Sequence, residues 1–169
     1  AAISIDAEVH DSPLFDDIDR LKIVFVDGVF DAAASDPLKS EGVEIESLAA
    51  ADAQAAHWAA DLYGKLEAAE QARVERPFAV LNTAAAQDGL LIRVTGKIER
   101  PVHVIYRRSG DGADVHIRHV VRLEPGSKLT LLETGMIGAR SNHVLEVDVA
   151  QDAQFHHIMG KRASHPKVG

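Results

Sequence analysis

The side chains best suited to chemistry in this sequence are its nine histidines, since imidazole serves as a metal ligand and as an acid or base near neutral pH. No two form a His-x-His pair, and His116 and His119, like the neighbours His156 and His157, are an odd number of positions apart. Side chains so spaced on a strand point to opposite faces. We therefore expect structural or surface roles for most of the rings, and the choice of any metal ligand stays open. The nine are His10, His57, His103, His116, His119, His143, His156, His157 and His165.

Paired carboxylates are the second possibility, because glycoside hydrolysis uses two of them as acid, base or nucleophile. Glu146 and Asp148 would share one face of a strand, but Arg122 is expected to pair with Asp148. Enzymes that act on sugars also present aromatic platforms, and the second half of the sequence offers mainly Tyr106 and Phe155. A secreted enzyme acting on polysaccharide is therefore the alternative, not the main hypothesis. The acidic candidates are Glu124, Glu133, Glu146, Asp148 and Asp152.

The sequence contains no other recognisable catalytic motif. The glycine-rich turns at 110–112 and 135–138 lack the Lys-Ser/Thr of a phosphate-binding loop, and no serine lies in a G-x-S-x-G motif. There is no cysteine, which excludes disulfides and thiolate ligands from this chain and fits a cytoplasmic location. We predict no catalytic residue and no cofactor-binding residue.

Alternating apolar and polar residues dominate the second half of the chain. Strands are expected at 91–94, 102–106, 115–123, 129–133, 144–149 and 155–159, with Gly, Asp or Pro in the turns. Residues 123–132 match 149–158 at a step of 26, and 100–105 match 127–132 at a step of 27. Periods of this length are typical of stacked repeats, in which one unit cannot bury its own apolar face.

In such a stack, equivalent residues lie directly above one another, about 4.8 Å apart, and should match in character. Arg122 then lies beside Asp148 as an oppositely charged pair. His157 falls on Leu131, an inward position, and we expect a β-bulge to remove this mismatch. About three strand-turn-strand coils fit, which leaves an open end with exposed strand edges, so we expect the chain to be either a fragment or completed by a partner. Three apolar columns are expected: Val121 and Leu123 beside Val147 and Val149, Val102–Leu129–Phe155, and Ile105–Leu132–Ile158.

The first half of the chain mixes strands and helices. Strands are expected at 3–9, 21–26, 29–30 and 43–48, with Asp27-Gly28 as a hairpin turn. Helical spacing of apolar residues predicts a helix over 52–74 and a second from Pro77 that ends at Asp88-Gly89. We therefore expect an N-terminal α/β region at 1–87, parallel β-helix coils at 88–160 and a disordered tail at 161–169.

The charge of the chain is uneven along its length. Residues 1–76 contain 17 acidic and 6 basic residues, a net charge of −11, whereas residues 77–169 contain 9 acidic and 12 basic residues, a net charge of +3. A charge of +3 spread over the second half is a poor basis for nucleic-acid binding. No apolar run approaches the roughly 20 residues that span a bilayer, so we expect no membrane partner.

Several segments together resemble the SufB/SufD family. They are 23–30 (IVFVDGVF), 77–84 (PFAVLNTA), 88–94 (DGLLIRV), 99–106 (ERPVHVIY), 123–133 (LEPGSKLTLLE) and 142–144 (NHV). The resemblance covers nearly the whole chain and depends on the order and spacing of the segments. The hairpin Val26-Asp27-Gly28 favours the SufD branch of the family.

The resemblance implies an α+β N-terminal region followed by a right-handed parallel β-helix of about three coils. It also implies a non-enzymatic scaffold of the SUF system, within a SufBCD complex that assembles iron–sulfur clusters. The expected partners are a SufB-like paralogue and a SufC-like ATPase, or a second copy in a homodimer. The family's later coils, its C-terminal helical region and the histidine linked to cluster formation are expected to lie outside this chain. No histidine here is therefore assigned that role, and no cofactor is expected on this chain itself.

Overall fold

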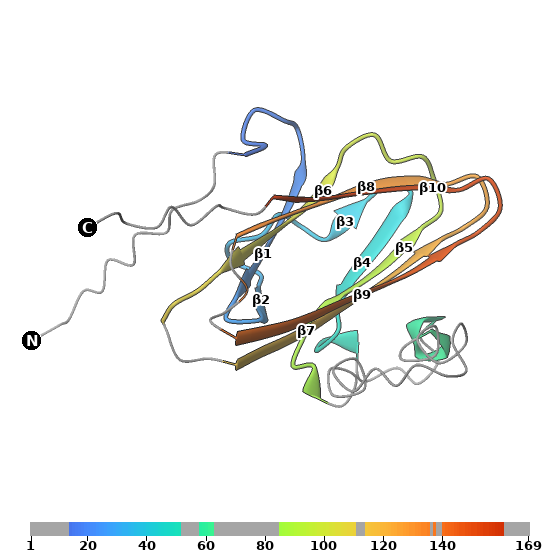
Figure 1. The fold of residues 1–169 in the computed structure, drawn as a ribbon. Helices are drawn as coiled ribbons and strands as arrows, with labels where there is room; N and C mark the ends of the chain where they lie inside the picture. The colour runs from blue at the N-terminus through green and yellow to red at the C-terminus, as the bar shows by residue number, and fades with distance from the viewer. Residues whose placement is uncertain are drawn as a thin grey trace, which may run out of the picture.

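The computed structural model describes residues 14–51, 58–62, 85–110, 114–135, 137 and 140–160. Two five-stranded β-sheets lie opposite each other and enclose the core (Figure 1). The first sheet has the order β10-β8-β6-β1-β2 and the second the order β3-β4-β5-β7-β9.

The strand boundaries agree closely with the alternation in the sequence. The first sheet contains β1 (Leu21–Val26), β2 (Val29–Asp31), β6 (Val102–Arg107), β8 (Lys128–Gly135) and β10 (Gln154–Gly160). The second contains β3 (Lys39–Ser40), β4 (Val43–Ser47), β5 (Leu90–Val94), β7 (Asp114–Leu123) and β9 (Arg140–Val149). All the strands predicted within the described residues are therefore present.

From β5 onward the chain alternates between the two sheets. β5, β7 and β9 pair in parallel in one sheet, and β6, β8 and β10 pair in parallel in the other. Leu91 pairs with Val120 and Val120 with Glu146, so the step is 29 residues (91 to 120) and then 26 (120 to 146). The predicted step of 26 and the pairing of Arg122 with Asp148 are confirmed. The right-handed parallel β-helix itself stays a prediction.

One predicted alignment is wrong by two residues. Val102 pairs with Leu131, not Leu129, and Ile105 pairs with Thr134, not Leu132. A shift of two preserves the alternation of faces, so residue polarity did not distinguish the two registers. The connection after β6 is longer than the equivalent connection one coil later. Tyr106 and Asp114 are eight positions apart (106 to 114), whereas their pairing partners Gly135 and Arg140 are five positions apart (135 to 140).

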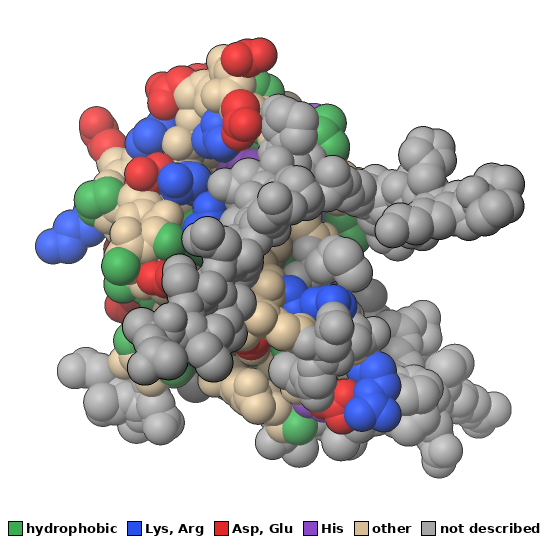
Figure 2. All heavy atoms as spheres, turned by 90° about the vertical axis from the view of Figure 1, so that its left-hand side faces the viewer, with side chains coloured by type: hydrophobic (Ala, Val, Ile, Leu, Met, Phe, Trp, Pro, Cys, Tyr) green, Lys and Arg blue, Asp and Glu red, His purple; other side chains and the backbone are tan. Residues whose placement is uncertain are grey.

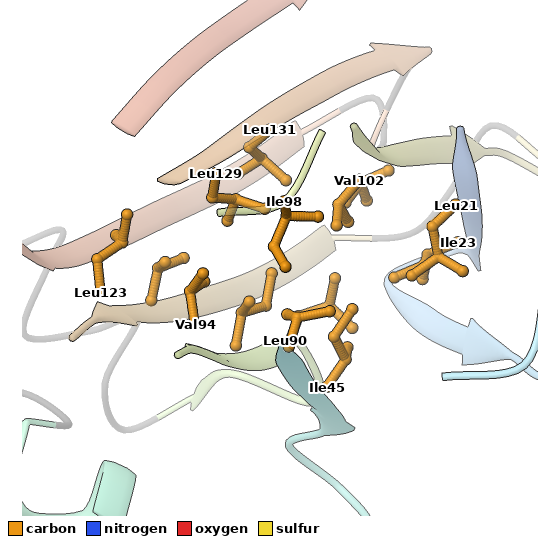
Figure 3. Close-up of a cluster of buried hydrophobic side chains, with 14 of the residues drawn as sticks. Leu21, Ile23, Ile45, Leu90, Val94, Ile98, Val102, Leu123, Leu129 and Leu131 are labelled. Atoms are coloured by element: carbon orange, nitrogen blue, oxygen red, sulfur yellow. The ribbon is translucent and has the colours of Figure 1, made fainter. Parts of the chain in front are cut away.

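The core lies between the two sheets and consists of the inward-facing residues of each strand (Figure 3). Fully burying one such aliphatic side chain stabilises the fold by roughly 1.5–3 kcal/mol. Alternation along each strand is what directs these side chains inward, since successive residues point to opposite faces. Core members include Leu21, Ile23, Ile45, Leu90, Val94, Ile98, Val102, Leu123, Leu129 and Leu131.

The hairpin between β1 and β2 is confirmed. Val26 pairs with Val29, and the two turn residues Asp27 and Gly28 have φ values of 49° and 81°. Positive φ at both central residues is typical of a type I′ turn, for which Asp-Gly is a preferred sequence. A Cβ on Gly28 would lie 2.4 Å from Cγ1 of Val115, so glycine is required here for space as well as conformation.

The predicted helices fall largely outside the described residues. Within the predicted 52–74 helix, Trp58–Asp61 forms a short 3-10 helix, η2. Ala59 and Leu62 pack against Leu91 and Val120 in a second apolar cluster. The strand at 3–9, the tail at 161–169 and the predicted helix from Pro77 as far as residue 84 also lie outside the described part, so the helical share of the α+β prediction stays a prediction.

Acidic and basic side chains are intermingled on the face that corresponds to the left side of Figure 1, with apolar side chains among them (Figure 2). Among the described residues, no helix has the length and apolar character needed to cross a bilayer.

Candidate functional site

Five polar side chains meet in the interior where β6 to β10 face one another. They are Tyr106 from β6, His119 from β7, Glu133 from β8, His143 from β9 and His157 from β10, and we call them the His–Glu cluster. Each occupies an inward position of its strand, as Glu133 does by following Leu129 and Leu131 at spacings of two. The two sheets therefore bring together residues that lie up to 51 positions apart in the sequence (106 to 157).

Glu133 is the centre of the cluster and is only 1% exposed. The Tyr106 hydroxyl donates a hydrogen bond to its Oε1, and Nε2 of His143 lies 3.1 Å from the same oxygen. Nε2 of His157 lies 2.5 Å from Oε2. Both carboxylate oxygens are thus engaged, which offsets the cost of burying the charge.

The tautomer of His119 follows from its contacts. Its Nδ1 accepts the backbone N–H of Leu90 at 2.9 Å, so this nitrogen carries the lone pair. The ring proton of the neutral form is then on Nε2, which donates to the Tyr106 hydroxyl at 2.7 Å. That hydroxyl in turn donates to Glu133. A directed chain of hydrogen bonds therefore runs from the Leu90 backbone to the carboxylate.

The cluster shifts the pKa values of its members apart. Burial alone would raise the pKa of Glu133, but the hydrogen bond and charge of His143, with contributions from His119 and Tyr106, lower it to about 2. Burial, and next the charge of His143, lower the pKa of His119 to about 3. Burial, the charge of Glu133 and its hydrogen bond raise the pKa of Tyr106 well above its usual value. At neutral pH the site therefore combines an ionised carboxylate with a neutral His119 and a neutral tyrosine.

Exposure increases across the cluster from one end to the other. The His119 and Glu133 side chains are each 1% exposed, whereas those of His143 and His157 are 15% and 29% exposed. β9 and β10, which carry the two outer histidines, are the last strands of their sheets. The cluster thus opens at the end of the stack formed by the last coil.

The chemistry available to the cluster is that of a proton carrier or a cation ligand. It contains no serine or cysteine and so lacks the nucleophiles of acyl transfer. Carboxylate and imidazole are the ligand types that bind zinc, iron and similar divalent ions. His119, Glu133 and His143 place ligand atoms within 4.8 Å of one another.

The remaining histidines lie elsewhere, as expected for structural or surface groups. His103 accepts from Arg20 Nε at 2.8 Å and lies 2.8 Å from the Thr134 hydroxyl. His116 is partly exposed and His156 exposed, and neither lies in the cluster. His10, His57 and His165 lie outside the described residues.

The predicted acidic candidates do not form a catalytic pair. Glu124 lies 3.0 Å from Arg93 Nε, and Asp148 lies 3.3 Å from Arg122 Nε. Glu146 and Arg118 form a buried pair at 2.6 Å, and Asp152 lies in a turn with φ of 59°. Since Tyr106 is also buried, it offers no platform for a sugar, and these contacts weigh against the polysaccharide hypothesis.

The predicted bulge at His157 is wrong. β10 pairs with β8 without interruption from Gln154 to Gly160, and His157 lies directly beside Leu131. The side chain therefore points inward as the alternation requires, and its polar end is accommodated because Glu133 is two residues further along β8.

The cluster itself was not predicted from the sequence. Its signal was present as polar residues at inward positions of successive strands, such as His119 two residues before Val121, and His157 two residues after Phe155. Comparing each histidine only with nearby residues in the sequence cannot reveal the cluster, because its other members lie on other strands.

Comparison with known families gives a match to the SufBD protein N-terminal region over residues 8–104. The match spans more than half of the 169 residues. It ends two residues before Tyr106, so the whole His–Glu cluster lies beyond it. No curated protein matches the chain.

Proposed function

The chain belongs to the SufB/SufD family, the family of SUF iron–sulfur cluster assembly, and on this premise we propose that it is a non-enzymatic, SufD-like scaffold component. The match over residues 8–104 is the observation that carries the proposal. The Asp27-Gly28 hairpin favours the SufD branch. The proposed partners are a SufB-like paralogue and a SufC-like ATPase, or a second copy of the chain, in the cytoplasm.

A docking role is supported by the last coil. Among the described residues, β9 and β10 each pair with a strand on one side only, so the other side of each is able to pair with a further strand, either from later coils of the same protein or from a partner. Val149 and Ile158 on these strands are each 48% exposed. Apolar side chains beside open edges suit the addition of strands from a related stack.

A role without catalysis is supported by the placement of the acidic residues. Glu124, Glu146 and Asp148 each engage an arginine, and such pairing occupies the carboxylates that acid–base catalysis would need. Glu133 is held ionised in the interior by its hydrogen bonds.

Co-purification tests the scaffold proposal. The chain is co-expressed with SufB-like and SufC-like proteins and recovered under anaerobic conditions by a tag on the chain. We expect both partners to be retained, and Ile158→Lys to reduce the recovered partner at least about tenfold, because a charge would be desolvated at the docking edge.

The matched control is Val29→Lys, which places the same charge at a 52% exposed apolar residue on β2, at the far edge of the first sheet. Circular dichroism of both variants verifies the fold. Equal partner recovery with Ile158→Lys and Val29→Lys would contradict docking at the last coil, and failure of the unaltered chain to retain either partner would contradict the scaffold role.

A further inference from the structure

Three metal-ligating side chains meet at the outer end of the His–Glu cluster. Nε2 of His143 lies 3.1 Å from Oε1 of Glu133, and Nε2 of His157 lies 2.5 Å from Oε2. The three residues come from β8 and β10, which are neighbours in the first sheet, and from β9 in the second sheet. One carboxylate with two imidazoles is a ligand set used by divalent zinc and by non-haem iron, with positions left open for water.

His119 is near this set but is not free to act as a ligand. Its Nδ1 lone pair accepts the Leu90 N–H, which leaves the proton on Nε2, the nitrogen that faces the cluster. Binding a metal through Nε2 would require the proton to move to Nδ1 and the buried Leu90 N–H to lose its acceptor, at a cost of about 1–3 kcal/mol. His119 instead orients Tyr106, and Tyr106 orients the carboxylate.

The spacing of His143 and Glu133 suits a shared ion, whereas His157 would have to move to join them, because the ligand atoms that lie within 4.8 Å of one another are those of His119, Glu133 and His143. Ligand atoms bound to one ion at about 2.0–2.2 Å lie roughly 3 Å apart, and the 3.1 Å separation of His143 and Glu133 agrees with this. The 2.5 Å contact of His157 is shorter and involves the other carboxylate oxygen. An ion would replace the protons in both contacts, and the 29% exposed His157 side chain on an edge strand has room to adjust.

The buried charge of Glu133 and the partial exposure of the two outer histidines also favour the binding of a cation. Glu133 is a buried carboxylate whose only described charged neighbours are imidazoles, and a buried charge is stabilised when a counter-charge joins it. The two outer histidines are partly exposed, so an ion has a route from solvent.

We propose that Glu133, His143 and His157, on β8, β9 and β10, bind a divalent transition-metal ion, with Tyr106 and His119 holding the carboxylate in position. This inference does not depend on the scaffold role proposed above.

Cobalt(II) titration tests the site, because bound Co²⁺ develops visible absorption that reports its ligands and Zn²⁺ displaces it. The chain is first stripped with a chelator. We expect saturation at one Co²⁺ per chain and loss of the absorption on addition of Zn²⁺. His143→Ala and His157→Ala should each weaken binding at least about tenfold, since even outer partners of a metal site contribute 10–100-fold.

The matched control is His156→Ala, which removes a histidine from the adjacent position of β10 on the opposite face. It should leave Co²⁺ binding unchanged. Absence of saturable absorption in the unaltered chain, or equal losses in His156→Ala and His157→Ala, would overturn the proposal.

A measurement on the unaltered chain removes any dependence on the folding of variants. Diethyl pyrocarbonate modifies accessible imidazoles, and peptide mass spectrometry identifies which ones. Zn²⁺ should protect His143 and His157 and leave His156 reactive. Unchanged modification of His143 and His157 at saturating Zn²⁺ would show that these rings do not bind the ion.

Discussion

Replacing Tyr106 by phenylalanine tests the hydrogen-bond chain at the centre of the cluster. The substitution keeps the ring, which is 5% exposed and belongs to the core, and removes only the hydroxyl. That hydroxyl donates to Glu133 and accepts from His119. Its loss therefore leaves one carboxylate oxygen with fewer donors and one buried N–H without its acceptor.

The expected cost follows from these two losses. A hydrogen bond to a charged group contributes about 1.5–3 kcal/mol, and a buried donor left unsatisfied costs about 1–3 kcal/mol. Part of this is recovered, because His119 Nε2 lies 3.8 Å from Glu133 Oε1 and a small rotation brings them together. We therefore expect the free energy of unfolding to fall by about 3 kcal/mol, near the lower end of the sum.

Urea unfolding at pH 7, followed by circular dichroism, measures this loss as a lower midpoint with an unchanged m-value. In a thermal scan the melting temperature should fall by about 6–12 °C, from about 2–4 °C per kcal/mol for a chain of this size. A double-mutant cycle with Glu133→Gln should show a coupling of at least about 1 kcal/mol. A loss below about 1 kcal/mol, or strictly additive variants, would refute the hydrogen-bond chain derived from the structure.

Two further predictions concern groups buried with their partners. The pKa of His119 is about 3 in the fold against 6.5 in an unfolded chain, so the unfolded state binds an extra proton between these values and stability falls as the pH drops from 6.5 to 3. His119→Gln should remove a slope of about 1.4 kcal/mol per pH unit near pH 5 in urea unfolding, and an unchanged slope would contradict the burial of a neutral ring. Arg118 and Glu146 are 0% and 5% exposed and lie 2.6 Å apart, so Arg118→Met should cost about 3–5 kcal/mol by removing the cation that pairs with a buried carboxylate. Adding Glu146→Leu should restore most of that loss, and a double variant as unstable as Arg118→Met would show that the buried carboxylate is not the cause.

The strands were predictable because their signals are local. Period-two alternation identifies Leu90–Val94 and Lys128–Gly135 without knowledge of any partner. The Asp27-Gly28 turn was likewise predictable, since the turn type depends on the backbone freedom of two adjacent residues. The 26-residue step predicted the pairing of Arg122 with Asp148 because matched residues in parallel strands repeat at the coil length.

The pairing register of the strands and the contacts of the polar cluster were harder to predict from the sequence. The two-residue error at Val102 arose because alternation is unchanged by a shift of two, while the length of the connection after β6 decides the register. A β-bulge was expected at His157 because its pairing partner Leu131 is apolar and faces inward. Its actual partner, Glu133, lies diagonally across the strand pair.

By itself, the sequence determined which residues form strands, where the turns lie, and that successive coils repeat, since each depends on neighbours along the chain. Only the tertiary structure decided that Tyr106, His119, Glu133, His143 and His157 share one site, which is buried at His119 and Glu133 and partly exposed at His143 and His157. The five residues lie on five strands, and the distances between their polar atoms depend on the facing of the two sheets and on the register of every pair. The pKa values of Glu133 and His119 are shifted only because that packing buries the two groups beside their partners.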